Sequence, residues 1–127
     1  TVVLAHGVRN ASDLAYRDYI ANELPRHEFL GEQIAAKLKY YPAVTREAFS
    51  FEGRDQRGRL TELLASGRIA ADLGLPPLDA AHDRAMLCGG PAMLADFRAL
   101  LDARGFQAAP RIGVPGQYVF ERAFVEK

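Results

Sequence analysis

Several features that would mark particular classes of protein are missing from this 127-residue sequence. It contains one cysteine, Cys88, so no internal disulfide can form. A lone cysteine suits a reducing compartment, and we expect the protein to be cytoplasmic. Sixteen basic residues balance sixteen acidic residues, so no net charge points to nucleic acid or to a membrane.

Sequence signatures of membrane proteins and of several enzyme classes are also missing. No apolar run approaches the roughly 20 residues that a membrane helix needs, and no signal peptide opens the chain. Neither a G-x-S-x-G motif nor a G-x-x-x-x-G-K-[ST] motif is present, which argues against a hydrolase elbow and against a P-loop. The three histidines, His6, His27 and His82, are scattered, and no carboxylates have ligand spacing, so we expect no metal site.

The length and the beginning of the chain suggest one compact domain taken from a longer protein. Hydrophobic residues make up 49% and charged residues 25%, the balance of a soluble globular protein. The chain begins at Thr1 and runs at once into the apolar stretch Val2 to Ala5. A domain seldom begins within a strand, so we expect this chain to be a fragment.

Strand and helix patterns alternate along the chain. The predicted strands are Val2 to Ala5, covered on both faces, Lys39 to Glu47, interrupted at Pro42, Arg84 to Cys88, and Tyr118 to Val125. The predicted helices are Ser12 to Leu24, Glu28 to Leu38, Arg59 to Ser66, and one from Pro91 to Gly105. This alternation predicts an α/β fold with a parallel sheet and helices on both faces, and ligands bind such sheets at the carboxyl ends of the strands.

Arginines follow the predicted strands where a dinucleotide would bind. Arg9 comes after the first strand, Arg46 ends the second, and Arg59 closes a polar loop before a helix. NAD-specific domains usually carry an acidic residue near the end of their second strand. The stretch that begins at His6 has no acidic residue before Asp13 and has Arg9 instead. The planar guanidinium group of arginine binds phosphate by donating two parallel charge-assisted hydrogen bonds. The pattern indicates a phosphate site, and solvated surface arginines are the alternative.

A second candidate is the turn from Cys88 to Met93, of sequence CGGPAM. Its two glycines would let a flat ring approach the backbone, and a helix begins at Pro91. The alternative is a buried cysteine that ends a core strand.

These stretches together resemble the bacterial ferredoxin (flavodoxin)–NADP reductases. The matching segments are HGVR with DLAY, YYPAVTRE, GRLTELLASG, DLGLPPL, CGGPAM and the ending YVFERAFVEK. Single motifs are weak, but their order and spacing over nearly the whole chain are specific. The resemblance implies a Rossmann-like fold and the C-terminal NADP(H)-binding domain of a reductase. Such a reductase moves hydride between NADP(H) and FAD and exchanges electrons with ferredoxin or flavodoxin.

The same resemblance implies roles for individual residues. Arg9, Arg46 and Arg59 match positions that hold the 2′-phosphate, with Thr61 beside them. The other matches lie near the rings of the cofactors: Cys88 and Gly89 against the nicotinamide, Ala123 near the isoalloxazine, and Phe124 near the adenine.

The resemblance also shows what this sequence lacks relative to the family. The N-terminal FAD-binding barrel and the glycine-rich turn after the first strand of the nucleotide domain are absent, so that strand would be missing and the fragment alone inactive. Ala48 stands where members of the family often have proline, and the loop from Arg54 to Gly58 is slightly longer than usual. The resemblance therefore does not fix the exact geometry of the 2′-phosphate site. We expect the full-length protein to be a monomer. Two alternatives stay open, the reductase module of an oxygenase and a non-catalytic nucleotide-binding domain.

Overall fold

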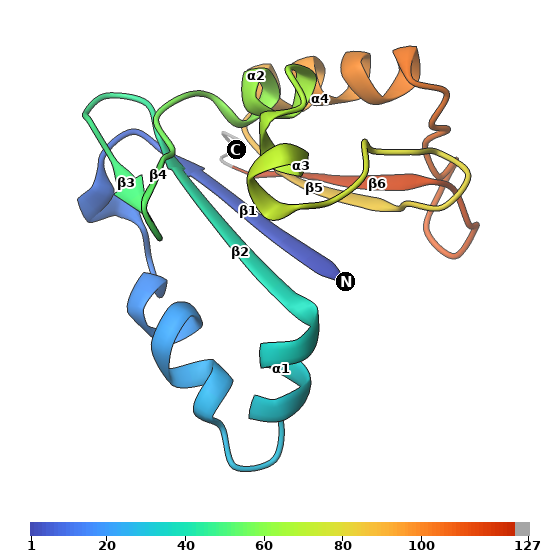
Figure 1. Cartoon of the computed structure of the whole chain (residues 1–127). Helices are drawn as coiled ribbons and strands as arrows, with labels where there is room; N and C mark the ends of the chain where they lie inside the picture. Colours follow the sequence, from blue (N-terminus) through green and yellow to red (C-terminus); the bar gives the residue numbers. More distant parts are fainter. Residues whose placement is uncertain (124–127) are drawn as a thin grey trace. The chain divides into compact units, whose positions relative to one another are not determined.

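The computed structural model of the chain describes residues 1–123 (Figure 1). They divide into a first unit, Thr1–Leu75, and a second unit that begins at Pro76. Each unit is built on one pair of parallel strands, β1–β2 in the first and β5–β6 in the second. Parallel pairing joined through helices is what the alternating sequence pattern predicted.

In the first unit, β1 (Val2–Val8) pairs with β2 (Leu38–Val44) over the full length of both strands. The connection between them contains η1 (Ala11–Asp13), η2 (Tyr19–Glu23), η3 (Leu24–Arg26) and α1 (Gly31–Lys37). After β2 come β3 (Ser50–Phe51), β4 (Arg54–Asp55), α2 (Leu60–Ala65) and α3 (Arg68–Leu73). The β3–β4 pair is a short antiparallel hairpin.

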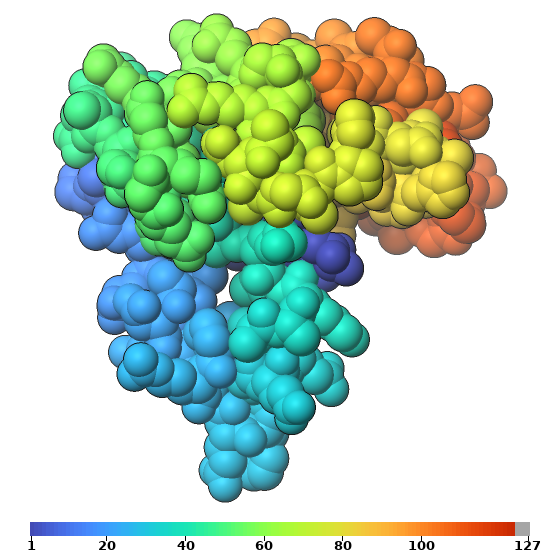
Figure 2. All heavy atoms as spheres, viewed as in Figure 1, coloured from blue at the N-terminus to red at the C-terminus, as the bar shows by residue number. Residues whose placement is uncertain are grey.

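The connection from η1 to α1 forms a helical lobe that leads to the amino end of β2 (blue to cyan in Figures 1 and 2). The prediction of one helix from Ser12 to Leu24 was wrong. Tyr16 adopts a positive φ of 62°, which an α-helix cannot contain, and η2 has π-helical geometry. The lobe therefore turns at Tyr16 rather than continuing as one cylinder.

The interruption expected at Pro42 is not seen, because β2 runs straight through it. The Val44 N–H donates to the Gln56 carbonyl on the side of β2 away from β1. Backbone groups alternate along a strand, so the nitrogen of Pro42 faces the same outer side as that of Val44. Its missing N–H therefore removes no bond to β1, and its carbonyl accepts a hydrogen bond from the Gln56 side chain (2.5 Å).

The prediction that the first strand is covered on both faces was also wrong for the described residues. Among residues 1–123, β1 pairs with β2 alone. Val2 is 58% exposed and Leu4 41% exposed. In contrast, Tyr41, Ala43 and Val44 of β2 are completely buried.

In the second unit, β5 (Ala85–Gly89) pairs in parallel with β6 (Tyr118–Arg122), and α4 (Pro91–Ala103) connects them. Pro91 is the first residue of α4, and Gly105 follows its end with a φ of 84°, as predicted. The core of this unit is formed by Leu101, Phe106 and Tyr118, whose hydroxyl donates to Asp102 (2.6 Å). No helix among the described residues is long and apolar enough to cross a membrane.

Candidate nucleotide-binding site

Backbone hydrogen bonds place the residues after β1 beside those after β2. The Thr45 N–H donates to the Val8 carbonyl at 3.0 Å, and the Arg46 N–H donates to the Arg9 carbonyl at 2.8 Å. The parallel register thus continues one residue beyond each strand. Arg9 and Arg46 are consequently neighbours at the carboxyl end of the pair, where ligands of parallel sheets bind.

The segment after β4 brings a third arginine to the same end. Val44 binds it twice, since its N–H donates to the Gln56 carbonyl at 3.1 Å and its carbonyl accepts from the Gly58 N–H at 2.9 Å. Gly58 has a φ of 148°, a conformation that favours glycine and that turns the chain toward α2. Arg59 follows directly as the N-cap residue of α2.

These segments surround an open, polar depression of about 540 Å³ in the first unit. Its lining residues are Arg9, Thr45, Arg46, Gly58, Arg59 and Glu62. All three guanidinium groups belong to exposed residues, and within residues 1–123 none of them forms an ion pair. Three uncompensated cations on one concave surface attract an anion, and the planar fork of arginine fits phosphate oxygens.

Two other side chains qualify the electrostatics of this depression. Glu62 is exposed and adds one negative charge to the lining. Glu47, the residue after Arg46, accepts a hydrogen bond from the Ala11 N–H at 3.3 Å. Thr61, expected beside the phosphate, is half-buried in α2 between two lining residues but does not itself line the depression.

The second unit holds the other predicted site residues at the carboxyl ends of its strands. Cys88 is exposed in β5, and Gly89 is buried. The Ala123 N–H donates to the Gly89 carbonyl at 2.9 Å, so these two predicted residues are in contact. A Cβ added at Gly90 would meet no atom within 4 Å, which leaves open space over the turn. Phe124 lies outside the described residues.

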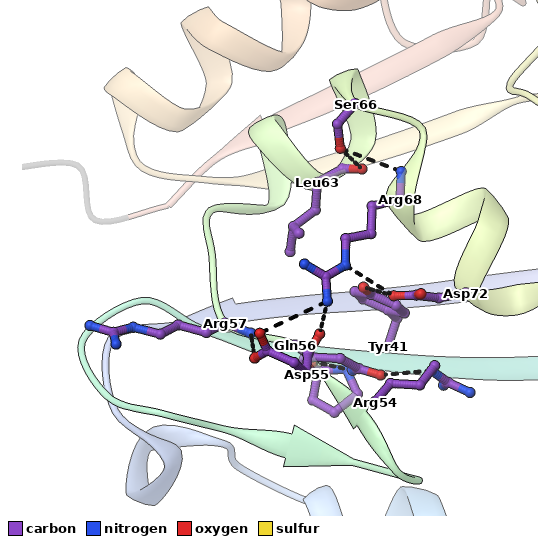
Figure 3. A network of polar contacts seen from close by, with 10 residues as sticks. Tyr41, Arg54, Asp55, Gln56, Arg57, Leu63, Ser66, Arg68 and Asp72 are labelled. Atoms are coloured by element: carbon purple, nitrogen blue, oxygen red, sulfur yellow. Dashed lines mark hydrogen bonds and ion pairs between the residues drawn. The ribbon is translucent and has the colours of Figure 1, made fainter.

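A polar network in the first unit was not expected from the sequence. Tyr41 of β2 contacts Asp72 of α3, Asp72 lies beside Arg68, and Arg68 reaches Asp55 of β4, the residue before Gln56 (Figure 3). Tyr41 and Gln56 are fully buried, and buried polar groups require partners. Burial and the hydrogen bond to Asp72 raise the pKa of Tyr41 well above its usual value, so its hydroxyl is a proton donor at all ordinary pH.

The sequence is similar to curated ferredoxin–NADP reductases along almost its whole length. It is 52% identical to the Pseudomonas aeruginosa enzyme and 50% identical to that of Azotobacter vinelandii, each over 126 residues, or 99% of this chain. It is 56% identical over 123 residues to ferredoxin–NADP reductase A of Sorangium cellulosum. The chain spans about half the length of these relatives, 42% to 47%. No family model matches the sequence.

The fold comparison agrees with the sequence comparison. The crystal structure of a ferredoxin NADP⁺ reductase from Neisseria gonorrhoeae, with bound FAD and NADP, matches with a TM-score of 0.74 at 31% identity. The match covers 98% of this chain and 45% of that one. The α/β fold of Rossmann type expected from the sequence is thereby confirmed.

Parallel strand pairs joined through helices define an α/β protein, and the arginines gather at the edge of the sheet where proteins of this class bind their ligands. Over almost its whole length, the chain is similar to about half of the length of these ferredoxin–NADP reductases.

Proposed function

We propose that this chain is the NADP(H)-binding part of an FAD-dependent ferredoxin or flavodoxin–NADP reductase. The depression lined by Arg9, Arg46 and Arg59 carries the proposal, because it holds three arginines against one carboxylate, Glu62, and no described carboxylate forms an ion pair with them. The 2′-phosphate is the group that distinguishes NADP(H) from NAD(H), and it needs such a site. A matched carboxylate would instead favour the ribose hydroxyls of NAD(H).

In this proposal, the first unit recognises the adenosine end of the cofactor. Arg9, Arg46 and Arg59 hold the 2′-phosphate, and Thr61 lies next to them. Since their guanidinium groups donate in pairs, they fix the orientation of the phosphate as well as its charge.

The second unit would receive the reacting rings. Cys88 and Gly89 would lie against the nicotinamide and Ala123 near the isoalloxazine, while the adenine contact implied for Phe124 falls outside the described residues. The open space over Gly90 and the Ala123–Gly89 hydrogen bond support a flat ring lying against this turn. NADP(H) and FAD supply hydride transfer when bound, and the chain's own residues orient the rings and exclude water.

The remaining parts of the protein and its partners belong to the same proposal. The FAD-binding barrel would be contributed by a part of the protein outside this chain. The electron partner is a ferredoxin-type carrier, and flavodoxin is the second carrier. The protein acts as a cytoplasmic monomer with no role in binding nucleic acid or membranes.

The test compares ligands that differ by one phosphate. In the complete reductase, Arg59→Met should weaken binding of 2′,5′-ADP by ten-fold or more, since a hydrogen bond to a charged group contributes about 1.5–3 kcal/mol. Binding of 5′-ADP should not change, and the KM for NADPH should rise while that for NADH stays constant. Isothermal titration calorimetry and steady-state kinetics make these measurements.

Arg26→Met is the matched control, because it removes the same charge from η3 in the helical lobe. It should leave both affinities unchanged. Equal losses for 2′,5′-ADP and 5′-ADP in Arg59→Met would refute the proposed phosphate site.

A further inference from the structure

We propose that Arg68 is a positioning residue for cofactor specificity: it clamps the segment Arg54–Gly58 against β2 and so holds Arg59 opposite Arg46. This inference rests on the proposed function, because it concerns how the 2′-phosphate site keeps its shape. Arg68 does not line the depression and would act without touching the ligand.

The segment Arg54–Gly58 is the one through which Arg68 would act. Gln56 and Gly58 of this segment both form backbone hydrogen bonds with Val44. Val44 stands two residues before Arg46, and Gly58 stands one residue before Arg59, and both arginines line the depression. Any shift of the segment along β2 therefore changes the distance between the two arginines. A bound phosphate senses such a shift because charge-assisted hydrogen bonds need close and well-directed donors.

Gln56 attaches this segment to β2 from within. Its side-chain amide donates to the Pro42 carbonyl (2.5 Å), and its carbonyl oxygen accepts from Arg54 Nε at 3.1 Å. Its own backbone N–H donates to the Phe49 carbonyl at 3.0 Å. A fully buried amide with these partners fixes the register of the segment, since a slip would leave polar groups buried without partners.

Arg68 closes the segment from the outside. Its Nη2 donates to the Asp55 carbonyl (2.5 Å) and lies 4.0 Å from an Asp55 carboxylate oxygen. In Figure 3 the guanidinium reaches from the start of α3 onto Asp55, while the Arg57 side chain points away from the network. One side chain thus joins α3 to the residue that precedes Gln56.

Asp72 and Tyr41 hold the guanidinium in that position. Arg68 Nε lies 3.7 Å from an Asp72 carboxylate oxygen one helical turn away. The same oxygen accepts a hydrogen bond from the buried Tyr41 hydroxyl at 2.6 Å. The chain of contacts runs from the β2 core through Asp72 and Arg68 to Asp55, and the half-buried carboxylate restricts the rotamers that Arg68 can adopt.

The first experiment separates positioning from general stability in the complete reductase. Arg68→Met should weaken 2′,5′-ADP binding about five-fold and raise the KM for NADPH equally, without changing kcat, the KM for NADH or 5′-ADP binding. In an Arg59→Met background, Arg68→Met should add less than a two-fold effect, because it acts through Arg59. Equal losses for both cofactors, or full additivity with Arg59→Met, would overturn the proposal.

The second experiment uses the sign of an effect. Asp72→Ala removes a negative charge from the neighbourhood of the depression, so simple electrostatics predicts tighter 2′,5′-ADP binding. The clamp predicts the opposite, a loss of two- to five-fold, because Arg68 loses its anchor. Tighter or unchanged binding in a variant with native circular dichroism would contradict the clamp.

The failure of the clamp and that of the proposed function give different results. If Arg59→Met weakens 2′,5′-ADP binding but Arg68→Met and Asp72→Ala do not, the phosphate site stands and the clamp is wrong. If Arg59→Met itself has no effect, the phosphate site is wrong. Arg26→Met serves again as the charge-matched control.

Discussion

Glu62 is the one acidic residue among the six that line the depression of the first unit. We predict that Glu62→Gln tightens 2′,5′-ADP binding about two- to four-fold. Exposed charge pairs are worth about 0.2–1 kcal/mol, and here the carboxylate opposes a phosphate instead of pairing with it. The gain should shrink as salt is added, because exposed charges are screened. Titration calorimetry at two ionic strengths makes the measurement.

Glu32→Gln, on the exposed face of α1, is the matched control and should have no effect. Weaker binding in Glu62→Gln would mean that the carboxylate holds an arginine in place. Glu62 would then support the binding of the phosphate and not repel it.

At the scale of single residues, the sequence predicted the three arginines but not the buried polar contacts beside them. Arg9, Arg46 and Arg59 each follow a strand or a turn, and residues at such positions are visible in a pattern. The contact between Gln56 and Pro42 is not, because it depends on the register in which a loop lies against β2. A buried tyrosine in a strand indicates that some partner exists, but it does not say which one.

Among the helices and strands, sequence patterns located the elements better than their internal geometry. β1, β2, β5, α2 and α4 lie within a few residues of where the sequence patterns placed them, although the patterns did not predict which strands pair. The segment from Ser12 to Leu24 failed, because helical spacing of apolar residues does not encode the positive φ of Tyr16. Pro42 also misled, since a proline is compatible with a strand when its nitrogen faces away from the paired neighbour.

Gly31, the first residue of α1, packs closely against the preceding helical turn. A Cβ added there would lie 2.5 Å from the Pro25 carbonyl oxygen, which belongs to the backbone and cannot rotate away. We predict that Gly31→Ala lowers the free energy of unfolding by about 1–3 kcal/mol, the usual cost of overpacking. Thermal unfolding followed by circular dichroism in the complete protein tests it.

Ala36→Gly in the same helix provides the comparison. It is exposed, and a glycine in a helix interior costs about 0.5–1 kcal/mol. If Gly31→Ala proves no more destabilising than this exchange, the lobe can move to accept a methyl group and the close contact is not essential.

At the scale of the whole chain, the proposal assigns flavin binding to a part of the protein other than these 127 residues. We predict that the 127-residue chain alone does not reduce ferricyanide with NADPH, with or without added FAD. The chain spans about half the length of its relatives, and the proposal assigns flavin binding to the other half. A diaphorase assay measures it, with the complete reductase as the positive control. Robust turnover by the chain alone would show that the flavin site is wrongly assigned.

The hydrogen bonds that Val44, Gln56 and Pro42 make on the outer side of β2 have a consequence for how the sheet can grow. The chain's own loop occupies the carbonyl of Pro42 and both backbone groups of Val44, and the proline offers no donor. A further strand cannot add along this half of β2, whereas β1 keeps its far edge available among the described residues. The loop after β4 therefore determines which edge of the first unit can accept a further strand, namely the free edge of β1.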